Sequence, residues 1–207
     1  MSERSILIVE DEPLVAEDIA AALMRNDFAI SAIVYTKEDA LNELKNNLPD
    51  VVILDINLNG EMHGIEIAET ISIQYNIPFI FLTSYSDKRT LTNAKVTEPS
   101  GYIVKPFTEA GLYSSIEIAL YNYAQKNKRN FPELKLTTLN QSLKTPISER
   151  EFQLLQLIYN GHSNKQIAAE LFISINTVKK HINNLYLKLE ASSHSSATAR
   201  IRELMCK

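Results

Sequence analysis

Residues 49–57 read Pro-Asp-Val-Val-Ile-Leu-Asp-Ile-Asn, so that four apolar residues, Val51 to Leu54, run directly into the carboxylate of Asp55. An uninterrupted apolar run of this length is typical of a strand that is buried on both faces of a parallel sheet. Asp55 would then lie at the carboxyl end of that strand, which is where open α/β sheets place their functional groups. Taken alone, an aspartate after a strand is usually a cap or turn residue, so its role depends on what the rest of the chain brings to it.

Short apolar segments and segments of helical periodicity alternate on both sides of this stretch. The sequence predicts strands at residues 5–9, 29–35, 50–54, 78–82 and 101–104, and helices at residues 14–25, 37–46, 65–74, 87–96 and 108–126. Strict alternation of this kind implies parallel strands, right-handed crossovers and helices on both faces of the sheet. We therefore expect residues 1–126 to form a doubly wound, five-stranded parallel sheet of the α/β class.

The remainder of the chain has a different character. Residues 127–145 are polar and basic, which predicts a linker. Residues 146–207 are helical in pattern throughout, and we expect helices at residues 148–159, 163–171, 174–189 and 195–205. Ser148 begins a segment with capping-box spacing, and Ser163 and Ser174 are suited to cap the next two helices. The expected second domain, residues 146–207, is a small all-α four-helix domain.

The bulk composition limits the class of protein. A chain of 207 residues with 45% hydrophobic residues has the usual composition of a globular protein. The apolar stretch at residues 77–82 is too short to cross a bilayer. The single cysteine, Cys206, excludes a disulfide within the chain. Because Met1 to Arg4 lead at once into a strand, we expect no signal peptide and a cytoplasmic protein.

Charge is divided unevenly along the chain. Residues 1–126 hold 9 Lys and Arg against 19 Asp and Glu, a net charge of −10, whereas residues 127–207 hold 12 against 6, a net charge of +6. A basic module joined to an acidic one is typical of proteins that bind a polyanion. Chance segregation of surface charge is the plainer alternative, so charge alone does not decide the partner.

Other strand ends bring polar groups to the same edge of the predicted sheet as Asp55. Glu10 and Asp11 follow the first strand, Thr83 follows the fourth, and Lys105 follows the fifth. Two carboxylates about 4 Å apart repel each other by roughly 4 kcal/mol at an effective dielectric constant of about 20, and a divalent cation relieves this repulsion. Hard oxygen ligands suit Mg²⁺, and a lysine with a hydroxyl suits a phosphoryl group. The pocket therefore predicts Mg²⁺-dependent phosphoryl transfer to Asp55.

Four motifs follow one another in residues 4–125. They are Ile-Leu-Ile-Val-Glu-Asp-Glu-Pro at residues 6–13, Pro-Asp-Val-Val-Ile-Leu-Asp at residues 49–55, Phe-Leu-Thr-Ser-Tyr-Ser at residues 81–86 and Gly-Tyr-Ile-Val-Lys-Pro-Phe at residues 101–107. Together and in this order they resemble the receiver domain of two-component response regulators, which has a flavodoxin-like fold. The resemblance implies that a sensor histidine kinase phosphorylates Asp55.

The same resemblance assigns roles to the other residues. It implies that Asp11 and Asp55 bind Mg²⁺, that Glu10 acts through water, and that the backbone carbonyl of Asn57 is a further ligand. Thr83 and Tyr102 would form a switch pair, Lys105 would contact the phosphoryl group, and the Lys105–Pro106 peptide would be cis. The only chemistry it implies is self-directed phosphoryl transfer, so we do not expect an enzyme.

The loop after Asp55 departs from the family pattern. Asn59 stands where the family usually has proline, and residues 60–64 make the loop one residue longer. We expect a more flexible loop, in which Glu61 or His63 either approaches the metal or simply faces solvent. Residues 95–100 also replace a shorter Gly-Ala turn between the fourth helix and the fifth strand.

Residues 147–205 carry a second set of motifs. Ile-Ser-Glu-Arg-Glu at 147–151, Gly-His-Ser-Asn-Lys-Gln-Ile-Ala at 161–168, Leu-Phe-Ile-Ser at 171–174 and Thr-Val-Lys-Lys-His-Ile-Asn-Asn-Leu at 177–185 resemble the LuxR/NarL-type helix-turn-helix. This implies binding to double-stranded DNA.

The predicted helix at residues 174–189 fits that role. Its apolar residues share one stripe, and its opposite side is rich in lysine and asparagine. Lys and Asn side chains suit base edges in the major groove, and a helix start suits a phosphate. We therefore predict base contacts from Lys180 and Asn183 and backbone-phosphate contacts from Thr177, Lys179 and Lys188. A solvated helix face is the alternative.

Two surfaces are candidates for a homodimer contact. One is the face made by the fourth helix, fifth strand and fifth helix of the first domain, because the fifth helix has more apolar residues than one buried stripe needs. The other is the last helix, Ser195 to Met205, which offers Ala197, Ile201 and Leu204. Burial of the linker over the fifth helix is the plainer alternative to the first surface.

Three other classes of protein are alternatives for this sequence. A receiver-like domain that no longer uses phosphate is at odds with the intact set Asp11, Asp55, Thr83 and Lys105. An aspartyl-phosphate phosphatase generally has a second Asp where this chain has Asn57. A small-molecule-gated regulator should not carry the acidic pocket. We therefore expect a DNA-binding response regulator in which phosphorylation favours dimerisation, release of the helix-turn-helix, or both.

Overall fold

The computed structural model describes residues 4–84, 93–128 and 134–205, with the backbone alone for residues 127 and 128. The chain divides into two compact units, Arg4–Leu120 and Tyr121–Lys207, and each is described by itself. Over the described ranges, every helix is too short or too polar to pass through a bilayer.

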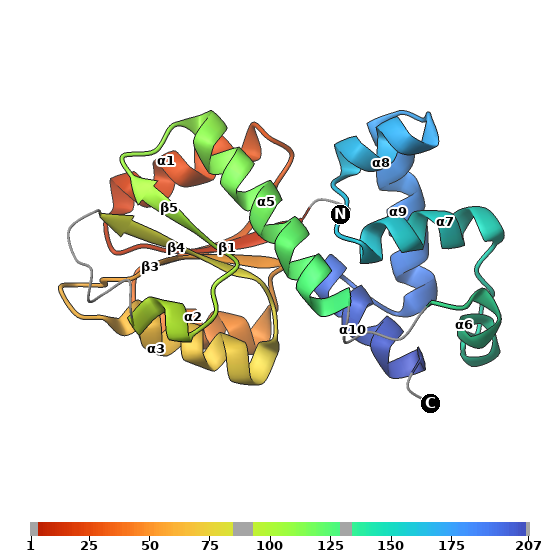
Figure 1. Cartoon of the computed structure of the whole chain (residues 1–207), viewed down its shortest axis with the longest axis horizontal. Coiled ribbons are helices and arrows are strands. Elements are labelled where there is room, and N and C mark those ends of the chain that lie inside the picture. Colours follow the sequence, from red (N-terminus) through yellow and green to blue (C-terminus); the bar gives the residue numbers. More distant parts are fainter. Residues whose placement is uncertain (1–3, 85–92, 129–133, 206–207) are drawn as a thin grey trace. The chain divides into compact units, whose positions relative to one another are not determined.

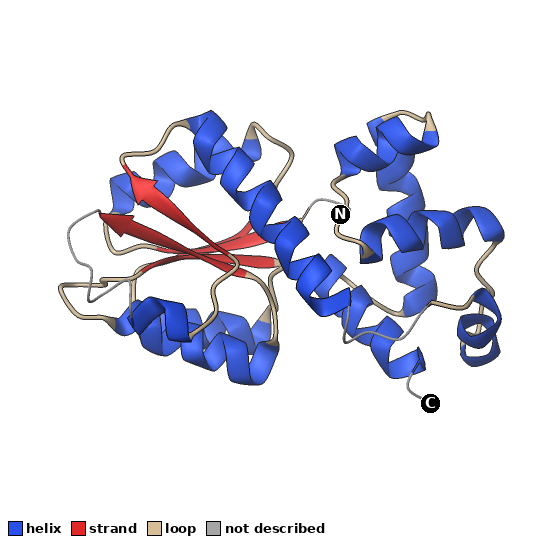
Figure 2. Cartoon of the chain, viewed as in Figure 1, coloured by secondary structure: helices blue, strands red, loops and turns tan. Residues whose placement is uncertain are grey.

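Five parallel strands form the sheet of the N-terminal unit (Figure 2). They are β1 (Ser5–Val9), β2 (Ala29–Val34), β3 (Val51–Asp55), β4 (Phe79–Ser84) and β5 (Gly101–Lys105), in the spatial order β2-β1-β3-β4-β5. This all-parallel sheet confirms the predicted doubly wound, flavodoxin-like fold. Because the strands are parallel, their carboxyl ends lie along one edge of the sheet.

Helices cover both faces of the sheet (Figure 1). α1 (Pro13–Met24) and α5 (Glu109–Lys128) pack on one face, and α2 (Lys37–Asn46) and α3 (His63–Thr70) pack on the other. α3 continues into a single π-helical turn, η1 (Ile71–Tyr75). Residues 93–96 are also helical, whereas the predicted start of that helix at residue 87 lies outside the described residues.

The central strands β1 and β3 are mainly apolar because each face of the sheet has its own core. Ile6 and Ile8 belong to the core beneath α1 and α5, whereas Leu7 and Val9 belong to the core beneath α2 and α3, and all four are fully buried. Both faces of a central strand must therefore be hydrophobic. This explains the apolar run that precedes Asp55 in β3.

The C-terminal unit is helical in its described part. Its helices are α6 (Leu136–Ser142), α7 (Glu149–Tyr159), α8 (Asn164–Leu171), α9 (Ile175–Leu189) and α10 (His194–Met205). The predicted N-caps are confirmed: Ser148, Ser163 and Ser174 each accept a hydrogen bond from the backbone three residues on. Side-chain oxygens satisfy N–H groups that the first helical turn leaves without partners.

One helix lies in the stretch where the sequence predicts a polar linker. α6 buries Leu139 completely in the core of the C-terminal unit. The amide of Asn140 donates to the carbonyl of Ile147 at 2.9 Å and accepts from the N–H of Ile147 at 2.7 Å. Part of the predicted linker is therefore built into the C-terminal unit, because its leucines are spaced for one face of a helix.

Candidate functional site

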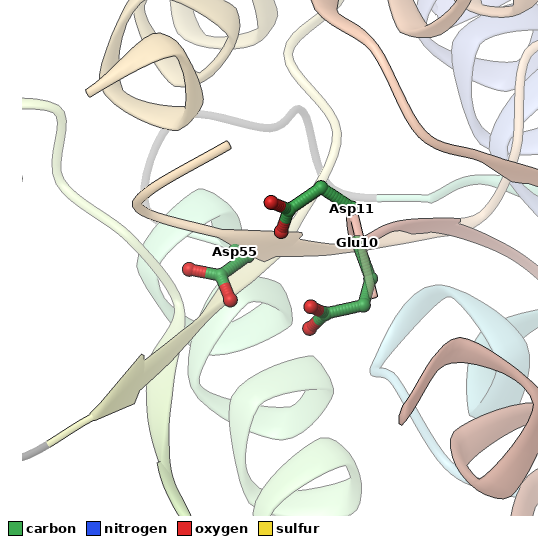
Figure 3. A group of neighbouring side chains, drawn as sticks. All are labelled: Glu10, Asp11 and Asp55. Atoms are coloured by element: carbon green, nitrogen blue, oxygen red, sulfur yellow. The ribbon is translucent and has the colours of Figure 1, made fainter. Parts of the chain in front are cut away.

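Glu10, Asp11 and Asp55 gather three carboxylates at the carboxyl ends of β1 and β3 (Figure 3). One oxygen from each residue lies within 4.8 Å of the other two. The two strands are neighbours in the sheet, with Val9 opposite Leu54, so the residues at and just beyond their ends come together. Glu10 is fully buried and Asp55 is 8% exposed. The sequence prediction that these acidic residues share one site agrees with this arrangement.

Lys105, the last residue of β5, reaches into the acidic group. Its Nζ lies 2.5 Å from Asp55 Oδ2 and 2.6 Å from Glu10 Oε2. The other oxygen of Asp55, Oδ1, accepts a hydrogen bond from the backbone N–H of Asn57 at 2.8 Å. Asp55 is thus fixed by a cation on one oxygen and an amide on the other. The Lys105–Pro106 peptide is cis, as the resemblance implied.

Burial and charge shift the ionisation of this group. The pKa of Glu10 is raised to about 6, because burial disfavours its charged form and Asp55 adds repulsion, although the hydrogen bond to Lys105 opposes the change. Burial acts to lower the pKa of Lys105, but hydrogen bonds and charge attraction from Asp55 and Glu10 outweigh it and raise that pKa. Lys105 therefore remains a cation at neutral pH.

The chemistry of these side chains fits Mg²⁺. All three acidic residues offer hard oxygen donors, which Mg²⁺ prefers. When they are ionised, three carboxylates against the ammonium group of Lys105 leave two negative charges in excess, which matches the charge of one Mg²⁺. Asp11 is partly exposed, so the group is open to solvent on that side and water can complete the coordination.

Thr83 and Tyr102 lie on the two strands beyond β3. Thr83 pairs with Val104 and Tyr102 pairs with Phe81 in the register of β4 and β5. The Tyr102 ring stacks on Phe81 with ring centroids 5.9 Å apart. Its phenolic oxygen is buried without a hydrogen bond in the described part of the chain, and burial raises the pKa of Tyr102. The role of the two residues as a switch pair stays a prediction.

The loop after Asp55 contains a closed turn at residues 58–61, and the expected flexibility of the loop stays a prediction. Leu58 and Glu61 exchange backbone hydrogen bonds of 2.9 and 3.1 Å. Between them, Asn59 has φ of 55° and Gly60 has φ of 83°. Two successive residues with positive φ are the signature of a two-residue type I′ turn, for which Asn-Gly is the preferred sequence. The turn therefore has a defined backbone conformation.

Glu61 and His63 do not join the acidic group. Among the described residues, the side chains grouped closely enough to hold a metal ion are Glu10, Asp11 and Asp55. Neither Glu61 nor His63 belongs to that group. Instead His63 Nε2 lies 2.9 Å from Glu61 Oε2, and the Glu61 side chain is 71% exposed. Of the two alternatives weighed from the sequence, the structure favours the one in which these side chains stay away from the metal.

Gly64 allows the turn and α3 to pack against the backbone at Asp55. A Cβ atom at position 64 would lie 2.0 Å from the carbonyl oxygen of Asp55 and 2.9 Å from Ile56 Cα. The N–H of Gly64 also donates to the carbonyl of Ile56 at 3.2 Å. The requirement for glycine here comes from close approach, because its φ lies outside the left-handed region.

In the C-terminal unit, α9 turns one face inward and the other outward. Its buried residues are Val178, Ile182, Leu185, Tyr186 and Leu189. Its exposed residues are Asn176, Lys180, Asn183, Asn184 and Leu187, and Thr177 and Lys179 are partly exposed. The two predicted base contacts therefore lie on the exposed face of α9. Asn184 lies on the same exposed face and was not predicted from the sequence. Its spacing of four residues from Lys180 is the signal that could have identified it, because residues four apart share one face of a helix.

Lys188 is held within its own unit. Its Nζ lies 2.8 Å from Glu151 Oε2 and 2.9 Å from the carbonyl oxygen of Pro146. Glu151 also completes the capping box of α7 by accepting from the N–H of Ser148. Burial acts to raise the pKa of Glu151, but the hydrogen bonds from Lys188 and Ser148 outweigh it and lower that pKa. A phosphate contact by Lys188 would have to replace this ion pair.

The predicted dimer surfaces differ in what they expose. Ala197, Ile201 and Leu204 of α10 are at most 2% exposed and belong to the core of their own unit. They are therefore not available to a partner, because the spacing that suggested an interface is the spacing of a core stripe. On the other candidate face, Val104 of β5 and Ile118 of α5 are 41% and 60% exposed.

Comparison with known proteins identifies both units. Residues 6–117 match the family model of the response regulator receiver domain, and residues 145–201 match that of the bacterial regulatory proteins of the luxR family. The nitrate/nitrite response regulator protein homolog of Haemophilus influenzae is 31% identical over 199 residues, covering 93% of each chain. The transcriptional regulatory protein DesR of Bacillus subtilis is 28% identical over 201 residues, covering 96% of each chain.

Solved structures agree with these matches. The signal receiver domain of a modulated diguanylate cyclase from Desulfovibrio desulfuricans has 31% sequence identity and a TM-score of 0.56, covering 60% of this chain and 99% of that one. A DNA-binding response regulator of the LuxR family from Staphylococcus aureus has 26% identity and a TM-score of 0.52, covering 56% of this chain and 98% of that one.

Proposed function

Because the chain belongs to the response regulators that join a receiver domain to a LuxR-family DNA-binding domain, we propose that phosphorylation of Asp55 controls how its C-terminal unit binds double-stranded DNA. The observation that carries this proposal is the position of Asp55. Its carboxylate lies at a strand end, between a lysine ammonium group and two further carboxylates. We infer that a sensor histidine kinase is the phosphoryl donor.

Asp55 and Lys105 have different roles in the proposed phosphoryl transfer. A carboxylate oxygen of Asp55 forms a bond to phosphorus as the bond from phosphorus to the histidine nitrogen of the kinase breaks, and that nitrogen keeps the electron pair. Lys105 supplies a positive charge within 2.5 Å of the Asp55 carboxylate, where the negative charge of the phosphoryl group develops. Phosphoryl transfer depends mainly on such positioning and charge neutralisation. The protein modifies itself and turns over no separate substrate.

Asp11 and Asp55 are the proposed Mg²⁺ ligands, with Glu10 acting through water and the carbonyl of Asn57 as a further ligand. When bound, Mg²⁺ neutralises charge on the carboxylates and on the phosphoryl oxygens. Glu10 also holds Lys105, since its Oε2 lies 2.6 Å from Nζ. Burial of Glu10 keeps this pair out of water, which strengthens the attraction.

Phosphorylation adds about −1.5 to −2 charges beside Lys105 and Thr83. We propose that Thr83 and Lys105 move toward the new group and that Tyr102 repacks. Among the described residues, the buried Tyr102 hydroxyl has no hydrogen-bond partner, which supports this proposal because no such bond is lost when the ring moves. The result would be homodimerisation, release of the helix-turn-helix, or both.

The proposed DNA surface is the exposed face of α9. Lys180 and Asn183 would read base edges, and Thr177 and Lys179 would contact phosphates. The first turn of α9 also suits a phosphate, because a helix N-terminus carries partial positive charge. Lys188 is a weaker candidate than the sequence indicated, since its ammonium group is already paired with Glu151.

Phosphorylation itself tests the first step. The protein incubated with acetyl phosphate and Mg²⁺ should gain the mass of one phosphoryl group, and Asp55→Asn should gain none. Lys105→Met should fold but label much more slowly, because it loses the cation next to the acceptor oxygen. Equal labelling of the wild-type and Asp55→Asn proteins would overturn the assignment of the acceptor.

A further inference from the structure

The type I′ turn at residues 58–61 is tied to the acidic group by one long-range hydrogen bond. The backbone N–H of Asn59 donates to Asp11 Oδ2 at 2.8 Å, across 48 residues of sequence. The first residue of the turn, Leu58, is 1% exposed and packs in the core between the sheet and the helices α2 and α3. The amide that reaches Asp11 thus belongs to a turn whose first residue is held in the core.

This hydrogen bond depends on the residue type at position 59. Proline has no backbone N–H and holds φ near −65°, whereas Asn59 has φ of 55°. The contact with Asp11 is therefore available to this chain because position 59 is occupied by a residue that can donate and can adopt the left-handed conformation.

The contact restricts the partly exposed carboxylate in the group. Glu10 is fixed by burial and by Lys105, and Asp55 is fixed by Lys105 and by the N–H of Asn57. Asp11 is partly exposed, and the N–H of Asn59 is the partner that orients it. An ordered carboxylate loses less side-chain freedom when it binds a cation than a mobile one does.

We propose that the turn at residues 58–61 is a positioning device for the metal site, in which the Asn59 N–H holds the Asp11 carboxylate toward Asp55 and raises the affinity for Mg²⁺. Asn59 is a positioning residue, because it acts through Asp11 and does not itself touch the metal. The inference rests on the proposed function, since it assumes that Asp11 is a ligand. Partners that orient metal ligands typically change metal affinity by about 10–100-fold.

The test compares matched variants of the full-length protein by calorimetric titration with Mg²⁺ alone. Asn59→Pro removes both the donor and the positive φ, and Asn59→Gly retains both. We expect Asn59→Pro to raise the dissociation constant for Mg²⁺ about tenfold and Asn59→Gly to leave it within about twofold of wild type. Urea unfolding without Mg²⁺ shows whether each variant folds.

A second pair keeps the test decisive if Asn59→Pro does not fold. Among the described residues, nothing lies within 4 Å of a Cβ atom placed on Gly60, and its φ is 83°. Gly60→Val therefore disturbs the turn mainly because a β-branched residue disfavours positive φ, whereas Gly60→Asn tolerates that φ. We expect weaker Mg²⁺ binding in Gly60→Val than in Gly60→Asn. Equal affinities within each pair whose two variants fold would overturn the inference and leave the proposed function intact. Absence of Mg²⁺ binding by the wild-type protein would refute the metal site and the inference together.

Discussion

Replacing Gly64 by alanine should damage the acceptor site directly. The added Cβ would lie 2.0 Å from the carbonyl oxygen of Asp55, whereas non-bonded heavy atoms are most stable at about 3.5 Å. The two atoms must therefore separate by about 1.5 Å. The obstacle is the backbone at the end of β3, which cannot rotate away as a side chain could.

The cost follows from this geometry. Overpacking a tight site typically costs about 1–3 kcal/mol, and we expect Gly64→Ala to lie near 3 kcal/mol because main-chain atoms of a buried strand must move. In a domain of this size that corresponds to a fall in melting temperature of roughly 10 °C. Phosphorylation by acetyl phosphate should slow as well, because the displaced residue is Asp55 itself.

Gly60→Ala is the matched control. It adds the same methyl group in the turn that precedes α3, where no atom of the described residues lies within 4 Å of the new carbon. Its cost is the strain of a positive φ, about 1 kcal/mol. Urea unfolding and the rate of phosphorylation measure both variants. If Gly64→Ala is as stable as Gly60→Ala and is phosphorylated at the wild-type rate, the close approach at residue 64 does not constrain the acceptor site.

Three further outcomes are expected. Glu151→Gln should destabilise the C-terminal unit by about 1.5–3 kcal/mol at neutral pH, because it breaks a charged hydrogen bond with Lys188. The pKa of Glu151 is lowered in the folded state, so this stabilisation should be complete above pH 4.5 and should be lost as the pH falls further. Urea titrations of the wild-type and variant proteins at several pH values measure it. Mg²⁺ should raise the melting temperature more at about pH 7.5 than at about pH 5. Glu10 has a pKa of about 6, and its protonation at the lower pH removes negative charge from the metal site. An equal increase in melting temperature at both pH values would contradict this. Asn183→Ala should weaken binding to a preferred DNA site by about 1–3 kcal/mol and relax the preference for one base. A selection from random DNA measures that preference. If the selected sequences and the affinity were unchanged, the DNA-binding face of α9 would be assigned wrongly.

The fold and the acidic group could be predicted because both follow from local pattern. β-α alternation fixes parallel strands, and parallel strands carry the residues at their ends to one edge. Glu10, Asp11, Asp55 and Lys105 each end or follow an apolar run, so their meeting needs no knowledge of side-chain packing. The helix starts at Ser148, Ser163 and Ser174 were equally local, since a cap contacts the backbone three residues on.

The features that the sequence did not predict depend on long-range contacts. The ion pair between Lys188 and Glu151 joins residues 37 apart, and a lysine on a polar helix looks the same whether it is paired or free. The hydrogen bond from Asn59 to Asp11 arises only when β1 and β3 are neighbours. The buried stripe of α10 was open to two interpretations, because a core and an interface share one spacing. The Asn-Gly turn was the exception, since that dipeptide could have been identified from the sequence.

In the proposed function, the phosphoryl group on Asp55 governs DNA binding. The most direct test measures the affinity of the full-length protein for one preferred DNA site, with and without acetyl phosphate and Mg²⁺, at fixed salt because the affinity depends on salt. We expect acetyl phosphate with Mg²⁺ to strengthen DNA binding by the wild-type protein and to leave DNA binding by Asp55→Asn unchanged. Equal affinity of the phosphorylated and unphosphorylated wild-type protein, with labelling of Asp55 verified, would contradict it.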